Sequence, residues 1–282
     1  WPFILFTKKR YVGNKYEFDL DKYKQTSMGI VTKRRDNAPI CKVVFGGIID
    51  IIMRTRQIGI SIDFLRKTIL SLTKGKFNLD TLIVSKTLSS YYKDPDRIAH
   101  KVLADRIAER DPGNKPQVND RIPYVYVNVK ENKKIKLLQG DKIEHPDYIK
   151  QHNLIPNYEY YITNQIMKPV CQIYGLCLEQ IPGYRPNEDF ELILKNLISQ
   201  GKTERDAEKR VLEKKQKIAG KLLFGDILRT LENKRKGNVE ITTWFSRKVP
   251  KPTKIFKKTT NKKNVNINLS DLDDDDSDDS DF

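Results

Sequence analysis

The spacing of apolar residues divides the chain into strand-like and helix-like segments. Over residues 1–38, short apolar runs and alternating positions predict strands in FILF, YEFDLDKY and GIVTKRRD, with a turn at Val12, Gly13 and Asn14. From residue 40 to about residue 72, apolar residues recur at helical spacing. The segment TLIVSKTL, at residues 81–88, again predicts a strand.

The clearest helical pattern covers residues 94–110. Asp94 is a suitable N-cap, and Pro95 fits the first turn, where a helix has no use for its missing N–H. The sequence DPG at residues 111–113 ends the pattern. We expect a helix with one buried apolar stripe, which consists of Ile98, Val102, Leu103 and Ile107.

The second half of the chain predicts one more strand and several helices. The alternating segment DRIPYVYVNV, at residues 120–129, predicts a strand, and KIKLL at residues 134–138 is its candidate hairpin partner. Helical spacing returns in three segments, which are residues 158–174 with a break or kink at Pro169, residues 189–198 and residues 203–233.

An excess of positive charge points to a polyanionic partner. The net charge is +16 although the last thirteen residues, SDLDDDDSDDSDF, contain eight aspartates, so the rest of the chain is more cationic still. Nucleic acid and an anionic membrane surface would both attract such a chain. Charge alone does not decide between these two partners. No apolar run approaches the ~20 residues that a membrane-spanning helix needs, and of the two partners we expect DNA and no membrane.

The cysteines and histidines indicate neither a disulfide framework nor a metal site. Cys41, Cys171 and Cys177 form no CxxC pair, and the three histidines do not have the spacing of zinc ligands. We therefore expect a reduced, intracellular protein. Because the sequence starts with Trp inside an apolar run, we also expect it to be a piece of a longer protein.

Two basic clusters follow apolar, strand-like runs in the first 38 residues. The first is Lys8, Lys9 and Arg10, with Tyr11 directly after it, and the second is TKRRD, with its acid at Asp36. Arginine forks bind phosphate oxygens in pairs, lysine adds a mobile charge, and a neighbouring aspartate can orient a guanidinium. Such groups can hold a nucleic-acid backbone without reading its sequence. The alternative is a pair of strand ends with solvated cations.

A third segment combines a helix end, a turn and a strand start. In RIAERDPGNKPQVNDRIPYV, a turn rich in Pro, Gly and Asn leads into a strand that Asp120 and Arg121 open. Taken alone, this segment is equally typical of a surface loop with a local ion pair.

These three segments, together with YYITNQIMKPVCQIYG, closely resemble the C-terminal part of family B DNA polymerases. The likeness is strongest to delta-type enzymes and to those of large DNA viruses, and it covers roughly residues 1–232. It implies an α+β fold, in which a remnant of the palm β-sheet is followed by a mainly helical thumb domain with a small β-hairpin and then by a disordered tail. The implied boundaries are palm 1–38, thumb 39–232 and flexible tail 233–282.

The resemblance also implies roles for individual residues. The Lys-Lys-Arg-Tyr segment would contact the minor groove and the backbone of the primer–template duplex. The second cluster would neutralise phosphates, and its acid would orient an arginine. Arg121 would belong to the thumb. Asn119 departs from the family, which commonly has Gly there, but Asn tolerates the left-handed conformation. The implied DNA-binding residues are Lys8, Lys9, Arg10, Tyr11, Lys33, Arg34, Arg35, Asp36 and Arg121.

The sequence lacks the two aspartate segments by which the family holds its catalytic metal ions. We therefore predict no catalytic residue and no metal ligand in this chain. Mg²⁺ and deoxynucleoside triphosphates would belong to the full-length enzyme. The predicted function is a part of a DNA-directed DNA polymerase that grips the primer–template duplex during replication, in the nucleus or in a viral replication factory. The alternative is a non-catalytic DNA-binding or clamp-tethered accessory protein.

The last part of the chain carries a separate candidate motif. In NVEITTWF, an amide residue, an aliphatic residue and two aromatic residues have the spacing of sliding-clamp ligands, although Asn replaces the usual Gln. The alternative is a chance apolar patch. The basic run at residues 247–263 is typical of a nuclear localisation signal or of a polyanion-binding arm, and the aspartates after it would compete with DNA or aid solubility. The candidate clamp-binding residues are Asn238, Ile241, Trp244 and Phe245.

Overall fold

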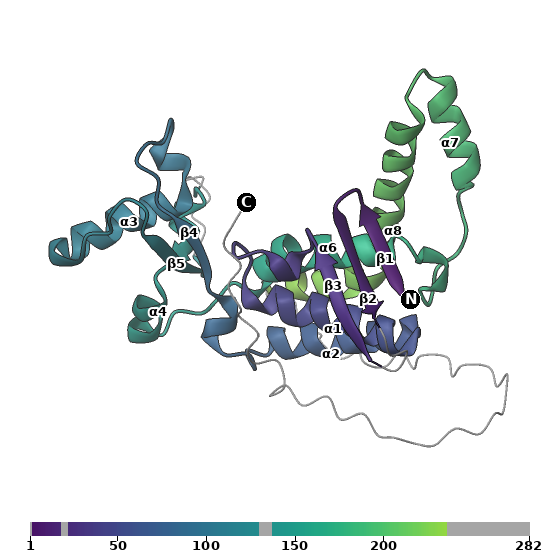
Figure 1. The fold of residues 1–282 in the computed structure, drawn as a ribbon. Coiled ribbons are helices and arrows are strands. Elements are labelled where there is room, and N and C mark those ends of the chain that lie inside the picture. Colours follow the sequence, from purple (N-terminus) through teal and green to yellow (C-terminus); the bar gives the residue numbers. More distant parts are fainter. Residues whose placement is uncertain (1, 18–21, 130–136, 236–282) are drawn as a thin grey trace. The chain divides into compact units, whose positions relative to one another are not determined.

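The structure is a computed structural model of the whole chain, and it describes residues 2–17, 22–129 and 137–235 (Figure 1). All of these residues belong to one compact unit, Trp1–Ser246. A second unit, Arg247–Phe282, lies outside the described residues.

The first sheet is antiparallel with the order β1-β2-β3, formed by β1 (Phe3–Thr7), β2 (Arg10–Tyr16) and β3 (Tyr23–Met28). The predicted turn at Val12 to Asn14 is wrong, because these residues lie inside β2. The chain reverses earlier, at Lys8 and Lys9, where Lys9 adopts a left-handed conformation with φ 64°. The ring of Phe3 on the neighbouring strand covers Gly13 and leaves no room for a Cβ there.

Two further strand predictions in this region are wrong. YEFDLDKY is not one strand, because β2 ends at Tyr16 and β3 begins at Tyr23. GIVTKRRD is not a strand either, since a short 3₁₀ helix, η1 (Val31–Lys33), leads from the sheet into the first long helix. Alternating polarity fits a turn and a 3₁₀ segment as well as a strand in such short stretches.

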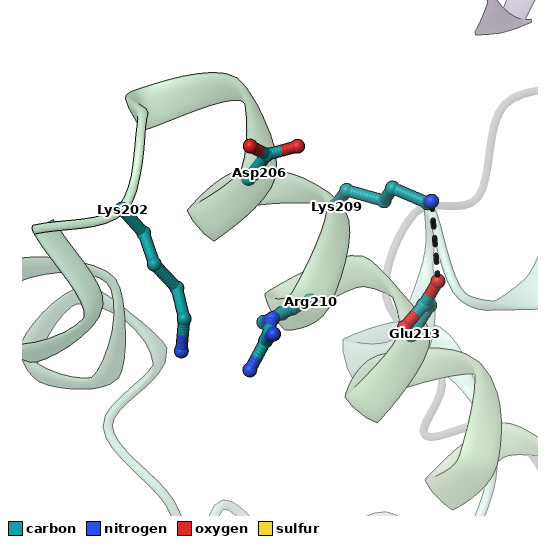
Figure 2. Close-up of a pocket in the computed structure, with 5 residues that line it drawn as sticks. All are labelled: Lys202, Asp206, Lys209, Arg210 and Glu213. Carbon is teal, nitrogen blue, oxygen red and sulfur yellow. Dashed lines mark ion pairs between the residues drawn. The ribbon is translucent and has the colours of Figure 1, made fainter.

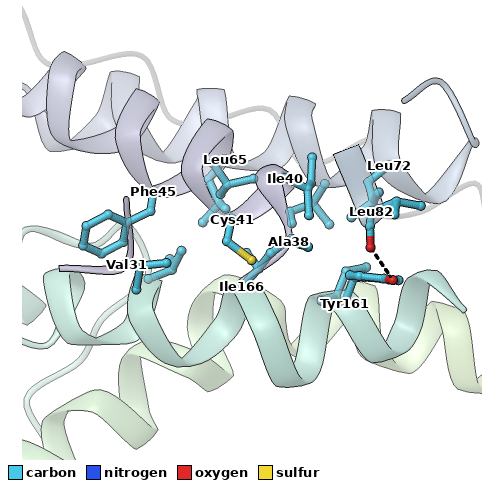
Figure 3. Close-up of a cluster of buried hydrophobic side chains, with 14 of the residues drawn as sticks. Val31, Ala38, Ile40, Cys41, Phe45, Leu65, Leu72, Leu82, Tyr161 and Ile166 are labelled. Atoms are coloured by element: carbon cyan, nitrogen blue, oxygen red, sulfur yellow. Dashed lines mark hydrogen bonds between the residues drawn. The ribbon is translucent and has the colours of Figure 1, made fainter. Parts of the chain in front are cut away.

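The helices predicted from residue 40 to about 72 are confirmed as α1 (Pro39–Thr55) and α2 (Ile58–Thr73). They pack closely, because a Cβ added at Gly47 would lie 2.4 Å from the ring of Phe64. Figure 3 shows the core between α1 and the later helices, where Cys41 lies near Ile166 and Phe45 lies beside Val31. A helical segment from each half of the chain therefore contributes to one hydrophobic core.

The second sheet is also antiparallel, with the order β4-β5-β6, formed by β4 (Val84–Thr87), β5 (Arg121–Tyr126) and β6 (Ile143–Glu144). The strands predicted at residues 81–88 and 120–129 are thus confirmed with shorter bounds. KIKLL is not the hairpin partner of β5: its described residues, 137 and 138, are outside any strand, and β5 pairs with β4 and β6 instead.

The predicted helix at residues 94–110 is confirmed over α3 (Ala99–Arg110) only. Residues Pro95–Arg97 form a 3₁₀ turn, and Asp94 makes no side-chain cap. The buried residues of α3 are Leu103 and Ala104, so the prediction that the whole stripe is buried was wrong. α3 packs beside a two-residue strand and a tight turn at Gly140. These short elements cover a narrower stripe of the helix than a wider sheet would.

The helix predicted over residues 158–174 contains a widened turn. It consists of α5 (Tyr158–Tyr160), a π-helical segment η6 (Tyr161–Ile166) and α6 (Met167–Tyr174). Pro169 has no N–H to donate to the carbonyl of residue 165, and the irregular turn lies directly before it. The predicted distortion therefore takes the form of a π segment. Its first residue, Tyr161, is buried and donates its hydroxyl to the Leu82 carbonyl at 2.6 Å (Figure 3).

The remaining helices are α4 (Pro146–His152), α7 (Phe190–Ser199) and α8 (Glu204–Arg235). The last two confirm the predictions at residues 189–198 and 203–233. Residues from the second half of α8 pack against α6, where Gly220 lies against the Cys171 sulfur. The described residues thus have the predicted α+β fold of two small sheets and a mainly helical remainder. The other short 3₁₀ turns are Leu79–Leu82, Pro112–Asn114, Gly140–Lys142 and Leu178–Gln180.

Candidate nucleic-acid interface

The turn between β1 and β2 presents two lysines to solvent. Lys8 and Lys9 are both exposed, and neither has an ion-pair partner among the described residues. Their charges are therefore available to an anionic partner. The ring of Tyr11, the first residue after the cationic run, stacks on that of Phe3 with a centroid distance of 5.5 Å. This contact stiffens the hairpin directly below the lysines.

Arg10 forms hydrogen bonds inside the fold. Its Nε donates to the Gly29 carbonyl at 3.2 Å, and its Nη2 donates to Oε1 of Gln172, on α6, at 3.0 Å. The guanidinium is only partly exposed. Arg10 thus links the first sheet to α6, and two of its three guanidinium nitrogens donate hydrogen bonds within the fold.

Gly29, directly after β3, packs on the backbone of the first basic cluster. It has φ +64°, and an added Cβ would lie 2.4 Å from the Lys9 carbonyl oxygen, so no other residue fits without displacement. The chain leaving β3 therefore packs directly against the β1–β2 turn. Lys33, the first cation of the second cluster, follows Gly29 by four positions.

The second cluster lies between η1 and α1. Lys33, Arg34 and Arg35 are all exposed. The acid of this cluster, Asp36, forms an ion pair with Nζ of Lys86, on β4, at a distance of 2.8 Å. The structure thus gives Asp36 a lysine partner where the sequence led us to expect an arginine. The hydrogen bond from Lys86 holds the pKa of Asp36 below its usual range, and the charges of Arg121 and Arg34 act in the same direction.

Arg121 is the first residue of β5 and reaches across to β4. Its guanidinium donates to the Ser85 hydroxyl at 3.1 Å from Nε and at 2.9 Å from Nη2, and Nη2 also donates to the Ser85 carbonyl at 3.0 Å. Since these acceptors are neutral, the positive charge is held in place but not cancelled. The turn before it has the predicted left-handed residue, with φ 74° at Asn119.

A groove of about 960 Å³ lies beside Arg121, between the loop at residues 111–120 and α4. It is lined by cations and acids together, among them Arg110, Lys115 and Asp147. Both faces of the Tyr148 ring in this groove are occupied, one by Arg110 at 3.8 Å and the other by the imidazole of His152. Tyr148 is therefore not available to stack on a base.

Glu144 anchors one wall of this groove, and sequence analysis did not find it. It is 6% exposed and receives two hydrogen bonds from Arg110, at 3.0 and 3.1 Å, and one from Arg106 at 3.1 Å. Burial alone would raise its pKa, but the hydrogen bonds of Arg110 and the His145 amide and the charges of both arginines together lower it. No local pattern indicates this cluster, because its arginines and its acid are 34 and 38 residues apart.

A second hollow, of about 380 Å³, lies at the start of α8 (Figure 2). Figure 2 shows Lys202 and Arg210 with their charged ends in the same open space. Lys209 and Glu213, on the same helix, form an ion pair at 4.0 Å. The sequence analysis placed no site here.

The four candidate clamp-binding residues, from Asn238 to Phe245, lie outside the described residues, as do the basic run and the aspartate tail. Within residues 2–17, 22–129 and 137–235, no three His, Cys, Asp or Glu side chains are grouped so that they could hold a metal ion. None of the helices in this part of the chain is long and apolar enough to cross a membrane.

Comparison with known proteins gives a consistent result. Residues 1–176 match the family model described as DNA polymerase family B. Two viral proteins named DNA polymerase are each 53% identical to the chain: that of Pyramimonas orientalis virus over 87% of the chain, and that of Acanthamoeba polyphaga mimivirus over 63%. The DNA polymerase delta catalytic subunit of Caenorhabditis elegans is 33% identical over 61% of the chain.

The chain spans only 20%, 10% and 16% of the lengths of these three relatives. The family model, however, covers well over half of the chain, and it includes both basic clusters, the Asp36–Lys86 pair and Arg121. The chain therefore belongs to DNA polymerase family B.

Proposed function

We propose that the chain is the C-terminal part of a DNA-directed DNA polymerase and that it grips the primer–template duplex while the whole enzyme extends the primer. One observation carries this proposal: Lys8 and Lys9, in the turn that packs on Gly29, and Lys33 to Arg35, which follow Gly29 in the chain, are all exposed and form no ion pair among the described residues. Cations without a carboxylate partner bind phosphates at a low desolvation cost. Contacts of this kind fix the position of a duplex but do not read its sequence.

The grip contributes to the reaction through position. Transfer of a nucleotidyl group needs the primer hydroxyl in line with the incoming triphosphate, and correct alignment is worth several kcal/mol of the barrier. A backbone held at the primer end by Lys9, and beyond it by Arg34 and Arg121, would keep that alignment from one cycle to the next. The residues of this chain bind and orient the duplex, and they perform no chemical step.

Family B DNA polymerases generally depend on divalent metal ions. In the whole enzyme, Mg²⁺ would activate the primer hydroxyl and stabilise the leaving phosphate of a deoxynucleoside triphosphate. The described residues offer no cluster of ligands for such an ion, so we assign no metal-dependent step to them. We place the whole enzyme in the nucleus or in a viral replication factory, and we retain a sliding clamp as a partner of residues 238–245.

Binding of the 282-residue chain to a fluorescent primer–template duplex tests the proposal. We expect similar affinities for duplexes of unrelated sequence, and weaker binding after Lys9→Ala or Arg34→Ala. Lys67→Ala, which removes an equally exposed lysine from α2, is the matched control and should have a smaller effect. Equal losses in all three variants would show that only net charge matters, and strong preference for one sequence would also refute a grip on the backbone.

A further inference from the structure

The free edge of the second sheet holds an arginine in an unusual way. β4 is the edge strand of its sheet, and the backbone hydrogen bond from Leu88 to Asp120 fixes the alternation of the ladder, so that the Ser85 carbonyl faces away from β5. The Ser85 hydroxyl accepts from Nε and Nη2 of Arg121, and its carbonyl accepts from Nη2. The third nitrogen, Nη1, makes no hydrogen bond within the part of the chain that the structure describes.

This arrangement fixes a guanidinium without neutralising it. The side chain of a free arginine loses rotamer entropy when it binds a phosphate, and a side chain that is already held loses less. A carboxylate would hold Arg121 as firmly, but it would also cancel most of its attraction for an anion. Ser85 avoids that effect because its two acceptor oxygens are uncharged.

The Asp36–Lys86 pair ties the second basic cluster to the same strand. Lys86 follows Ser85 on β4, and its ammonium lies 2.8 Å from the Asp36 carboxylate. These two charges offset each other. Arg34, two positions before Asp36, and Arg121 form no ion pair of their own among the described residues, although both lie close enough for their charges to act on Asp36. The pair therefore keeps Arg34 near the strand on which Arg121 is held.

We propose that the free edge of β4 is a phosphate-binding site for the duplex backbone, in which Ser85 positions Arg121 and the Asp36–Lys86 ion pair positions Arg34. The inference rests on the proposed grip on DNA and extends it, because Ser85, Asp36 and Lys86 act through the arginines rather than on the phosphate. It also explains why an acid lies within a cationic cluster that binds a polyanion.

The opposite view is that both contacts are only structural. Arg121 would then do no more than cover the free edge of β4, and Asp36–Lys86 would be an exposed ion pair of little worth. The two views differ in what they predict for Asp36. Removal of an acid makes the protein more cationic, so general electrostatics predicts tighter DNA binding for Asp36→Asn. The positioning role predicts weaker binding.

The experiment measures binding of a primer–template duplex by the 282-residue chain over a series of salt concentrations. Asp36→Asn should bind the duplex roughly three- to tenfold more weakly, which is the usual effect of losing one charge-assisted contact. Its slope of log K against log [salt] should be flatter by about one than that of the unchanged chain. Asp50→Asn is the matched control, because Asp50 forms a 2.9 Å ion pair with Arg54 on α1, and it should bind as tightly as the unchanged chain or more tightly. Ser85→Ala should weaken binding without any change in charge, and Ser85→Thr, which keeps the hydroxyl, should restore it.

Thermal melting of each variant separates a loss of position from a loss of fold. The proposal requires weaker binding by variants that melt within about 2 °C of the unchanged chain, which corresponds to less than ~1 kcal/mol. Tighter binding by Asp36→Asn, or unchanged binding by Ser85→Ala, would overturn it. If Arg34→Ala still weakens binding in that case, the proposed grip stands and only the positioning role fails. If Lys9→Ala and Arg34→Ala also have no effect, the grip itself fails.

Discussion

Replacement of Glu144 by Gln should unfold the chain at a markedly lower temperature. The Glu144 side chain is 7% exposed and forms ion pairs with both Arg106 and Arg110, whose side chains are 24% and 36% exposed. Loss of one partner from a buried ion pair costs about 3–5 kcal/mol. The exposed fractions of the two arginines allow water to reach them in the variant, so we expect about 3 kcal/mol, and a fall in melting temperature of roughly 6–12 °C follows.

The pH dependence identifies the cause of this loss. The pKa of Glu144 is lowered in the fold, so its ionised form stabilises the folded state fully above its ordinary pKa of 4.5, and this contribution is lost as the pH falls through the lowered value. The difference between Glu144→Gln and the unchanged chain should therefore be constant from pH 7 to about pH 5 and narrow below pH 4.5.

Circular dichroism during heating and during denaturation by urea measures both effects. Glu109→Gln, an exposed change on α3, the helix that carries Arg106 and Arg110, is the control and should alter the free energy of unfolding by less than about 0.5 kcal/mol. Equal stability of the two variants, or a difference that does not depend on pH down to the acid unfolding of the chain, would refute the view that Glu144 acts as a buried anion between two arginines.

Three further predictions concern other parts of the chain. Asn119→Ala should lower the free energy of unfolding by about 1 kcal/mol, because φ is 74° there, whereas Asn119→Gly should not, and urea denaturation distinguishes them. A peptide of residues 236–251 should bind the sliding clamp of the source organism. Each aromatic anchor should contribute ~2 kcal/mol or more to the binding free energy, so replacement of both Trp244 and Phe245 by Ala should abolish the heat of binding measured by calorimetry. Equal heats from the two peptides would remove the clamp from the list of partners. The 282-residue chain should incorporate no nucleotide with Mg²⁺ present, and incorporation that survives purification controls would mean that metal-binding carboxylates were overlooked.

Sequence periodicity predicted the elements that bury a regular stripe. The strand β5 and the long helix α8 were found because their patterns continue for many residues, and α3 was found with a shorter start because a 3₁₀ turn separates Pro95 from it. The first sheet was misplaced because its turn consists of Lys8 and Lys9, and lysine is not among the residues that mark a left-handed turn.

The partners of the site residues were beyond the reach of the sequence for a different reason. Arg10 and Gln172 are 162 positions apart, and Arg121 and Ser85 are 36 positions apart, so only the folded chain brings them together. The sequence indicated which residue types could bind phosphate, and the resemblance implied where. The partners that hold Arg10, Asp36 and Arg121 in place are seen only in the structure. The boundaries of palm and thumb at residues 38 and 232 stay predictions.

The salt dependence of duplex binding tests the central claim most directly. Each phosphate contact releases counterions, so the slope of log K against log [salt] counts the contacts. For the chain with both Lys9→Ala and Arg34→Ala, we predict a slope flatter by about two than that of the unchanged chain, at roughly one for each lost contact. A slope that does not change in the double variant would contradict the claim that these two basic clusters hold the DNA backbone.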